Sequence, residues 1–483
     1  MDAVKAALDP SVISELHEVA DGMLKIYRTL ARMQFIEDAW IEEGPHDMTP
    51  WLPICHRLGI DNCIIYLYSI LPYVINHGMG DLEFYRGGDF LDFRDERTIE
   101  EGRNPMYNED EKGHMRSWMT SLSGVGNEAT ALLYDAKWHH IGIYAFYDHA
   151  GSDPNLHKQE YCERDEQTRW KIEVEGWVSD RSSDEDEDEN EKEEEEEDDE
   201  ENYWDEMHGR SAPFVLRDIV SWYEDLSEVP GGSAGYPRWD IEVVKPLYIK
   251  HGWPHAFKSD AFLIDQAIAY TFVSKEDRHE SLTRWIENHK RFLSRDEDKS
   301  IQEARKTIAD DSADVDALWL ARWRIWDMER YRAETERQLR EAEAAYALPV
   351  DEQLWQIERL RDEINSERRN RQKYHEKLLS RDESDEPATR WNTPEALGAN
   401  RDYHEKYFGV YERAYKAFRA EVGGDSFFTD RGIVEAEIEN GSDIRAQRRR
   451  EEAEAIRVWL LQVPEEAVSA RECARKSIES ALI

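Results

Sequence analysis

The chain has 483 residues, of which 40% are hydrophobic and 11% aromatic, so it is long enough for two or three domains with cores of their own. Its formal net charge is −44, which disfavours direct binding to nucleic acid, because such binding needs Lys and Arg to neutralise phosphates. The same charge disfavours anionic membrane surfaces and leaves a basic protein as the partner that electrostatics would favour.

The beginning of the chain predicts two helices. Apolar residues recur at steps of three and four between residues 11 and 43, with Ser11 as the expected N-cap. A second, buried helix is expected within 62–75, ending near Pro72. This stretch contains the longest apolar run, 12 residues from Ile64 to Ile75, and a bilayer span needs about 20. We therefore expect no membrane segment, and the N-terminus does not have the pattern of a secretory signal.

The next part of the chain predicts short strands instead of helices. Short aromatic stretches at 82–85 and 90–93 predict strands or tight turns, and stretches that are β-branched, aromatic or alternating in polarity predict strands at 129–134, 141–147 and 170–175. The short turn between 129–134 and 141–147 predicts a β-hairpin. Helices followed by strands indicate an α+β N-terminal domain over residues 1–178.

The stretch 179–207 is strongly acidic. Residues 184–201 contain sixteen carboxylates and one lysine, a net charge of about −15. Such a run cannot bury apolar surface and repels itself, so it is predicted to be a disordered acidic linker between the N-terminal domain and the rest of the chain.

The remainder of the chain predicts a mainly α-helical region. Residues 208–280 read as a helical and loop-rich packed segment, and two long charged helices over 281–380, interrupted at Pro349, suggest a long helical hairpin. Further helices are expected over 381–483. Trp319, Trp323 and Trp326 fall on one helical face and predict a buried seam between helices.

The four cysteines are scattered, at Cys55, Cys63, Cys162 and Cys473. They form no CxxC pair and no His/Cys spacing of a structural zinc site. In a chain this long, so few cysteines are typical of reduced thiols, which favours a cytoplasmic or nuclear location.

The best candidates for a metal site are His139, His140, Asp148 and His149, with His157 as a further ligand. Imidazole and carboxylate could bind zinc or iron if they converged. Adjacent residues of a strand point to opposite faces, however, so His139 and His140 are poorly placed to share one ion. The alternative is that they are solvent-exposed turn histidines, and no cofactor is expected.

The acidic run itself is a candidate partner-binding site, beginning with Asp184, Glu185, Asp186, Glu187 and Asp188. Ser182 and Ser183 precede it, each with an acidic residue three positions on, so they are candidate sites for an acidophilic kinase. Phosphorylation there would add further negative charge to the run.

A family resemblance rests on four motifs of the first part. They are LPYV (71–74), GGDFLDFRD (87–95), GNEATALLYDAKWHHIGIYAF (126–146) and GSDP (151–154). With these motifs the chain resembles a family of uncharacterised proteins of filamentous fungi, and its helices-then-strands layout is similar to that of the Smi1/Knr4-like (SUKH) binding modules. The resemblance covers about 150 residues and implies an interaction module rather than an enzyme.

Three functions therefore stay open. The first is an intracellular protein-interaction or scaffold protein, whose folded surfaces bind a protein partner. The second is an acidic chaperone-like binder of basic proteins, in which the acidic run makes the contact. The third is an enzyme with an unrecognised cleft in the N-terminal module, although we find no phosphate loop, nucleophile elbow or HExxH motif.

Overall fold

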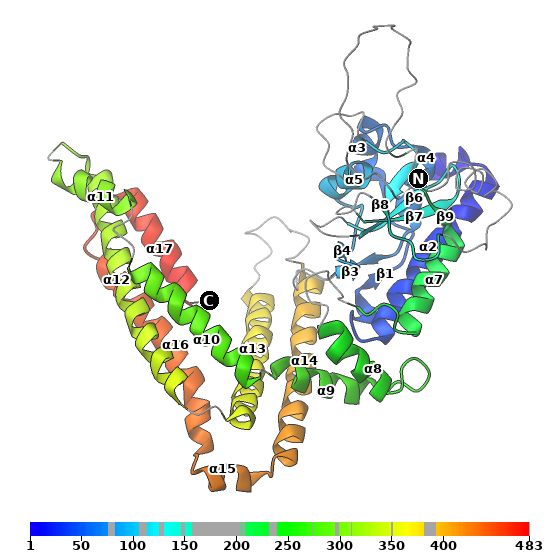
Figure 1. Cartoon of the computed structure of the whole chain (residues 1–483). Helices are drawn as coiled ribbons and strands as arrows, with labels where there is room; N and C mark the ends of the chain where they lie inside the picture. The colour runs from blue at the N-terminus through cyan, green and yellow to red at the C-terminus, as the bar shows by residue number, and fades with distance from the viewer. Residues whose placement is uncertain are drawn as a thin grey trace, which may run out of the picture. The chain divides into compact units, whose positions relative to one another are not determined.

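The computed structural model divides into two compact units. The first comprises Met1–Leu263 with Ser384–Leu397, and the second comprises Ile264–Glu383 with Gly398–Ile483. The described residues are 1–75, 83–105, 114–124, 130–145, 150–156, 204, 208–230, 239–272, 274–294, 299–310, 312–348, 351–380 and 393–482. In Figure 1 the first unit runs in colour from blue to green.

The first unit combines helices with a small antiparallel sheet, as an α+β domain should. Its helices are α1 (Asp2–Ala6), α2 (Pro10–Arg32), α3 (Leu52–Arg57), α4 (Asn62–Ile70), α5 (Glu96–Arg103), α7 (Ala212–Glu224) and α8 (Lys245–Lys250), and α9 (Ser259–Thr271) contains the boundary to the second unit. A π-helical turn, Trp239–Val244, precedes α8. Short 3-10 turns lie at Asp38–Trp40 and Thr49–Trp51.

Helix α2 is the central helix of this unit. Its apolar stripe, predicted from the spacing, is buried: Leu16, Val19, Met23, Ile26 and Leu30 are at most 1% exposed. Helix α7 packs closely against it, because Gly22 has no side chain. A Cβ there would lie 2.5 Å from Leu216 Cδ1.

The ends of α2 differ from the prediction. Its N-cap is Asp9 rather than Ser11, because the Asp9 carboxylate accepts the backbone N–H of Ser11 at 2.8 Å. The helix ends at Arg32 and not near residue 43. Gln34 adopts a left-handed φ of 61°, and the N–H of Phe35 closes back onto the carbonyl of Leu30, as in a helix-terminating C-cap motif.

The main sheet has five short strands. They are β5 (Met119–Ser121), β6 (Thr130–Asp135), β7 (His140–Ala145), β8 (Ala150–Gly151) and β9 (Arg210–Ser211). The order is β5-β6-β7-β8, and β9 also pairs with β7. The predicted hairpin is confirmed as β6 and β7, in register from Thr130 opposite Ala145 to Asp135 opposite His140.

Two smaller strand pairs flank this sheet. They are β1 (Ile41–Glu42) with β2 (Tyr73–Val74), and β3 (Glu83–Tyr85) with β4 (Gly88–Asp89). Residues 90–93, predicted as a strand or a tight turn, form no strand, and β4 ends just before them. Arg86 and Gly87 both have positive φ, 44° and 81°, which makes a two-residue turn and brings Gly88 directly opposite Tyr85.

The acidic stretch does not join the two units. The strand before it, β8, and the strand after it, β9, both pair with β7, so the stretch is an insertion in the first unit, and the boundary between the units lies at Leu263. Residues 157–203, with Ser182, Ser183, the run 184–188 and the strand expected at 170–175, lie outside the described residues.

Trp204 anchors the chain on the far side of this insertion. It is 2% exposed and packs with Met115, Met119 and Tyr144 beside the sheet. Trp204 falls within the predicted linker 179–207, and for this residue the prediction is wrong. Its indole contributes to the core because the chain must return to the sheet to form β9.

The second unit is helical. It contains α10 (Lys275–Leu293), α11 (Lys299–Ala309), α12 (Val315–Ala347), α13 (Glu352–Ser380), α15 (Asp425–Arg431), α16 (Glu435–Leu460) and α17 (Val468–Leu482), together with most of α14 (Pro394–Glu421). In the part of the chain that the structure describes, no helix has both the length and the apolar composition of a membrane span.

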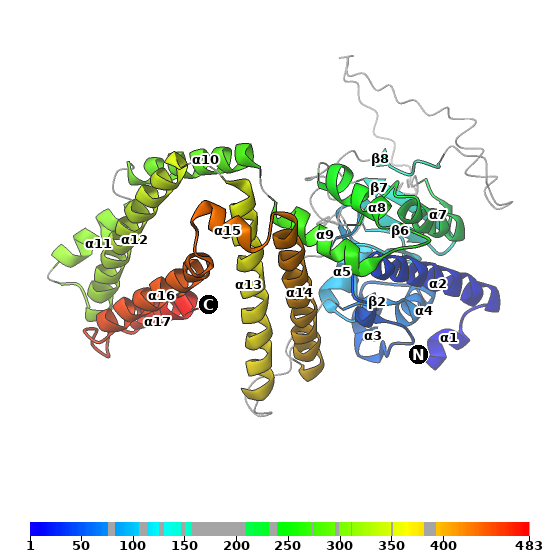
Figure 2. The ribbon, with the colours of Figure 1, turned by 90° about the horizontal axis from the view of Figure 1, so that it is seen from below.

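The two longest helices are present, but they do not form the predicted hairpin. Figures 1 and 2 show α12 and α13 leaving their junction in different directions. Helix α13 pairs with α14 instead, through Glu367 with His404 at 2.6 Å and Arg371 with Glu405 at 2.6 Å. Helix α12 packs against α10, α11 and α17.

Cys55, Cys63 and Cys473 are free thiols, and Cys162 lies outside the described residues. Burial raises the pKa of Cys55 and of Cys63 to about 11. Both are therefore protonated and unreactive near neutral pH, which is typical of structural cysteines rather than of nucleophiles.

Candidate functional site

The predicted tryptophan seam forms part of the core of the second unit. Trp323 is 5% exposed and packs with Ile456 and Trp459 of α16. Its ring centroid lies 4.7 Å from that of Trp459, in an edge-to-face arrangement that favours aromatic pairs. Helix α17 closes the cluster with Ala470 and Ala474, and Ala467, just before this helix, adds a third small side chain.

The other two tryptophans of α12 border an open groove. On α12 the groove is lined by Trp319, Arg322 and Trp326. Opposite them lie Glu451, Glu454, Ala455, Val458 and Trp459 of α16 and Gln462 just beyond its end, around a cavity of about 730 Å³. We call this the tryptophan groove. The two sets recur at helical spacing, so each helix presents one continuous stripe to it.

Apolar surface is exposed along this groove. Val458 is 50% exposed, and Leu461, which follows the end of α16 and lies outside the groove lining, is 87% exposed. Single exposed apolar residues are common, but aromatic and aliphatic side chains gathered around one concavity indicate an interaction surface. Only Trp323 of the predicted seam is fully buried, while Trp319 and Trp326 are half-buried.

The arginines in and beside the tryptophan groove contact an aromatic ring or carboxylates. The Arg322 guanidinium lies 4.8 Å from the centroid of the Trp319 ring, a cation–π distance. Next to the groove, Arg330 is bonded to Asp327 at 2.8 Å and to Glu452. Burial lowers the pKa of Arg330, but these bonds outweigh it and the pKa lies above its ordinary value. The lining itself holds two carboxylates and one guanidinium.

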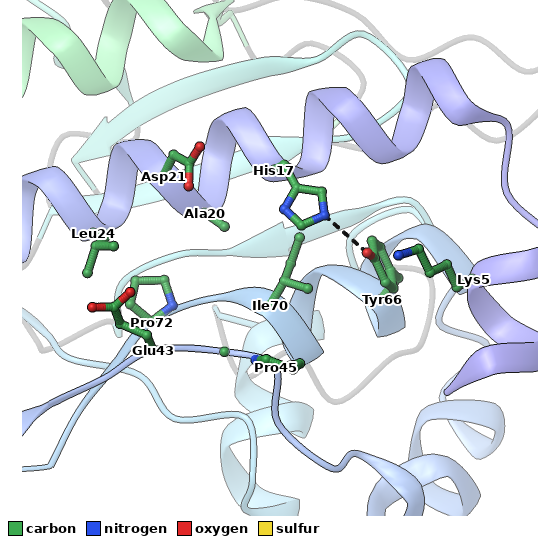
Figure 3. A pocket seen from close by; sticks show the side chains of 11 residues that line it. Lys5, His17, Ala20, Asp21, Leu24, Glu43, Pro45, Tyr66, Ile70 and Pro72 are labelled. Atoms are coloured by element: carbon green, nitrogen blue, oxygen red, sulfur yellow. Dashed lines mark hydrogen bonds between the residues drawn. The ribbon is translucent and has the colours of Figure 1, made fainter.

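A second cavity lies in the first unit, between α1, α2, α4 and the loop around residue 44 (Figure 3). We call it the α2–α4 pocket. Its volume is about 290 Å³, at the lower end of the roughly 300–1,000 Å³ of ligand pockets. Its lining residues are Lys5, His17, Ala20, Asp21, Leu24, Glu43, Gly44, Pro45, Tyr66, Ile70 and Pro72.

His17 and Tyr66 make the internal polar contact of this pocket. His17 Nε2 lies 3.1 Å from Tyr66 Oη, and either atom can be the donor, depending on the imidazole tautomer. Lys5 Nζ lies 5.6 Å from the centroid of the Tyr66 ring. Tyr66 is only 5% exposed, so its position is fixed by the core while the two basic side chains reach it from the surface.

A buried ion cluster lies beside the acidic insertion. Arg210 donates to Asp153 at 2.6 Å and pairs with Asp218 at 2.9 Å. The side chains of Arg210 and Asp153 are 7% and 3% exposed. Burial lowers the pKa of Arg210, but its bonds and charges to the two carboxylates raise the pKa above its ordinary value. Because Asp153 follows β8 and Arg210 begins β9, this cluster fastens the two ends of the insertion together.

The predicted metal ligands are not brought together. His139 and His140 are each 8% exposed, so the interpretation as solvent-exposed turn histidines is wrong. His139 contacts Tyr134 Oη at 3.1 Å and Glu18 Oε2 at 3.3 Å, and so joins the hairpin to α2. Within the described ranges, no three His, Cys, Asp or Glu side chains are grouped to hold a metal ion. Asp148, His149 and His157 lie outside those ranges.

No protein-family model, no curated protein sequence and no solved structure matches the chain. The likeness to fungal proteins and to SUKH modules therefore stays an expectation from the sequence.

Proposed function

We propose that the protein is an interaction or scaffold protein that binds a protein partner in the tryptophan groove. The observation that carries the proposal is the exposed apolar lining of this groove, formed by half-buried Trp319 and Trp326 together with Val458. Tryptophan is enriched among the residues that dominate binding energy at interfaces.

The partner that fits is an amphipathic helix with basic residues flanking its apolar face. A groove between two helices accepts a third helix by the same packing that joins α12, α16 and α17. The charge of the groove and of the chain also favours a partner with basic residues. Two of the three charged lining residues, Glu451 and Glu454, are acidic, and the whole chain carries a formal charge of −44. A basic flank would be attracted and an acidic one repelled.

The test uses a designed amphipathic helix with leucines on one face and lysines beside them, titrated into the full chain by calorimetry. Val458→Arg places a like charge in the groove at an exposed position, and we expect it to weaken binding at least about tenfold. Val468→Arg is the matched control, since Val468 is 63% exposed and does not line the groove. Equal weakening by both variants, or by neither, would contradict the proposal.

The acidic chaperone-like function is the second candidate, because residues 184–201 concentrate about −15 charges. The run lies in an insertion that begins and ends in the first unit, since β8 and β9 both pair with β7. A basic partner, a cytoplasmic or nuclear location and phosphorylation of Ser182 or Ser183 belong to this proposal. The enzyme function stays a prediction.

A further inference from the structure

Much of the lining of the α2–α4 pocket comes from one face of each of two helices. From α2 it receives His17, Ala20, Asp21 and Leu24, and from α4 it receives Tyr66 and Ile70. Residues three, four and seven positions apart lie on one face of a helix, so each helix contributes a single stripe. Ala20 is buried and lines the pocket with a small side chain.

The two ends of the pocket carry opposite charge. Figure 3 shows Lys5, His17 and Tyr66 grouped at one end, and Asp21 and Glu43 at the other. Glu43 is already paired with Arg28. Among the described residues, the side chains of Lys5 and Asp21 form no ion pair, so each is available to a ligand.

Apolar side chains separate these ends. Ala20 and Ile70 lie between the basic and the acidic groups in Figure 3, and Leu24 and Pro72 lie beside the acidic ones. His17 and Asp21 are four residues apart, about 6 Å along α2. A dipeptide is about 7 Å long when extended, so its charged ends can reach both groups.

We propose that the α2–α4 pocket binds a small zwitterion, best represented by a dipeptide with an aliphatic side chain. The ligand's carboxylate is bound by Lys5, with His17 and Tyr66 as hydrogen-bond partners, and its ammonium group is bound by Asp21. A dianion is disfavoured because Asp21 and Glu43 would repel its second charge. This binding is separate from the partner proposed for the tryptophan groove, which lies in the other unit.

The experiment titrates alanyl-leucine into the full chain, followed by saturation-transfer NMR and calorimetry. N-acetyl-alanyl-leucine lacks the cation and alanyl-leucine amide lacks the carboxylate. We expect saturable binding of the free dipeptide in the millimolar range or tighter, and at least about tenfold weaker binding of each blocked form. No saturable binding of the dipeptide, or equal binding of all three, would overturn the proposal.

Two charge variants test which end of the pocket binds the ammonium group of the dipeptide and which end binds its carboxylate. In Asp21→Asn, the free and N-acetylated dipeptides should bind alike, and in Lys5→Met the acid and the amide should bind alike. Both side chains are exposed, so neither change should unfold the unit. Lys25→Met, an exposed lysine of α2 that does not line the pocket, is the control and should keep both preferences. If Asp21→Asn still preferred the free dipeptide to its N-acetylated form, and Lys5→Met still preferred the acid to the amide, the ligand would bind elsewhere.

Discussion

Replacing Trp323 with Ala is expected to destabilise the second unit by about 3–5 kcal/mol. The indole is 5% exposed and lies between α12, α16 and α17, so its removal loses buried apolar area and leaves a cavity that neighbouring helices can only partly fill. Chemical denaturation of the full chain would measure the change. Hydrogen exchange in α12, α16 and α17 would assign it to this unit.

Arg324→Ala is the matched control for this change. Arg324 is the next residue of the same helix and is exposed, so its truncation should change the free energy of unfolding by no more than about 0.5 kcal/mol. A loss below about 1 kcal/mol for Trp323→Ala would contradict the burial of this indole. The whole seam would then be an open surface.

Replacing Arg210 with Met is expected to destabilise the first unit by a similar amount. Met conserves much of the side-chain volume but removes the charge, and Asp153, only 3% exposed, is left without its partner. Removing one member of a buried ion pair costs about 3–5 kcal/mol, because the remaining charge is buried and uncompensated. Hydrogen exchange in β7 and α7, combined with denaturation, would measure this loss.

The double variant Arg210→Met with Asp153→Asn separates charge from packing. Asn can still accept the backbone N–H of Asn155, which Asp153 binds at 2.8 Å, and it carries no charge, so part of the lost stability should return. The control is Arg57→Met, which breaks pairs with Glu96 and Glu100 at an arginine whose side chain is 59% exposed. Exposed pairs contribute about 0–1 kcal/mol. If Arg57→Met cost as much as Arg210→Met, burial of the cluster would not explain the effect.

Features that depend on neighbouring residues were predictable from the sequence. The buried stripe of α2 follows from apolar spacing of three and four, and the β6–β7 hairpin from two strands with a short turn. The burial of Trp323 follows from the same periodicity. In each case the residues that predict the feature are close together in the sequence.

Features that depend on distant residues were not predictable. Whether α12 folds back on α13 depends on which helix offers the better complementary surface, and α14 supplies it through His404 and Glu405. From its sequence the acidic stretch resembles a linker between domains. The ion pair between Arg210 and Asp153, which lie on either side of the stretch, shows that both of its ends belong to the first unit. Trp204, an aromatic residue at the end of the acidic run, was the one available sign that the chain returns to a core there.

The candidate sites divide in the same way. Trp319 and Trp326 were singled out by their spacing, but Trp459, which completes the tryptophan groove from α16, was not. His17 and Tyr66 lie 49 residues apart and belong to no motif. Only the packing of α2 against α4 brings them together. Conversely, the conspicuous histidines His139 and His140 are buried in the hairpin.

The most direct test of the account compares the tryptophan groove with the acidic run as the binding surface. The lysine-flanked helix is titrated into the full chain and into a chain lacking residues 184–201, each at physiological and at high salt. The Debye length is about 8 Å at physiological salt, so solvent-exposed charge contacts weaken steeply as salt rises, whereas apolar burial in a groove does not. We expect affinity that survives the deletion, falls only modestly with salt and is at least about tenfold weaker in Val458→Arg. Affinity that disappears with the deletion and falls steeply with salt would contradict the account and leave the acidic run as the binding site.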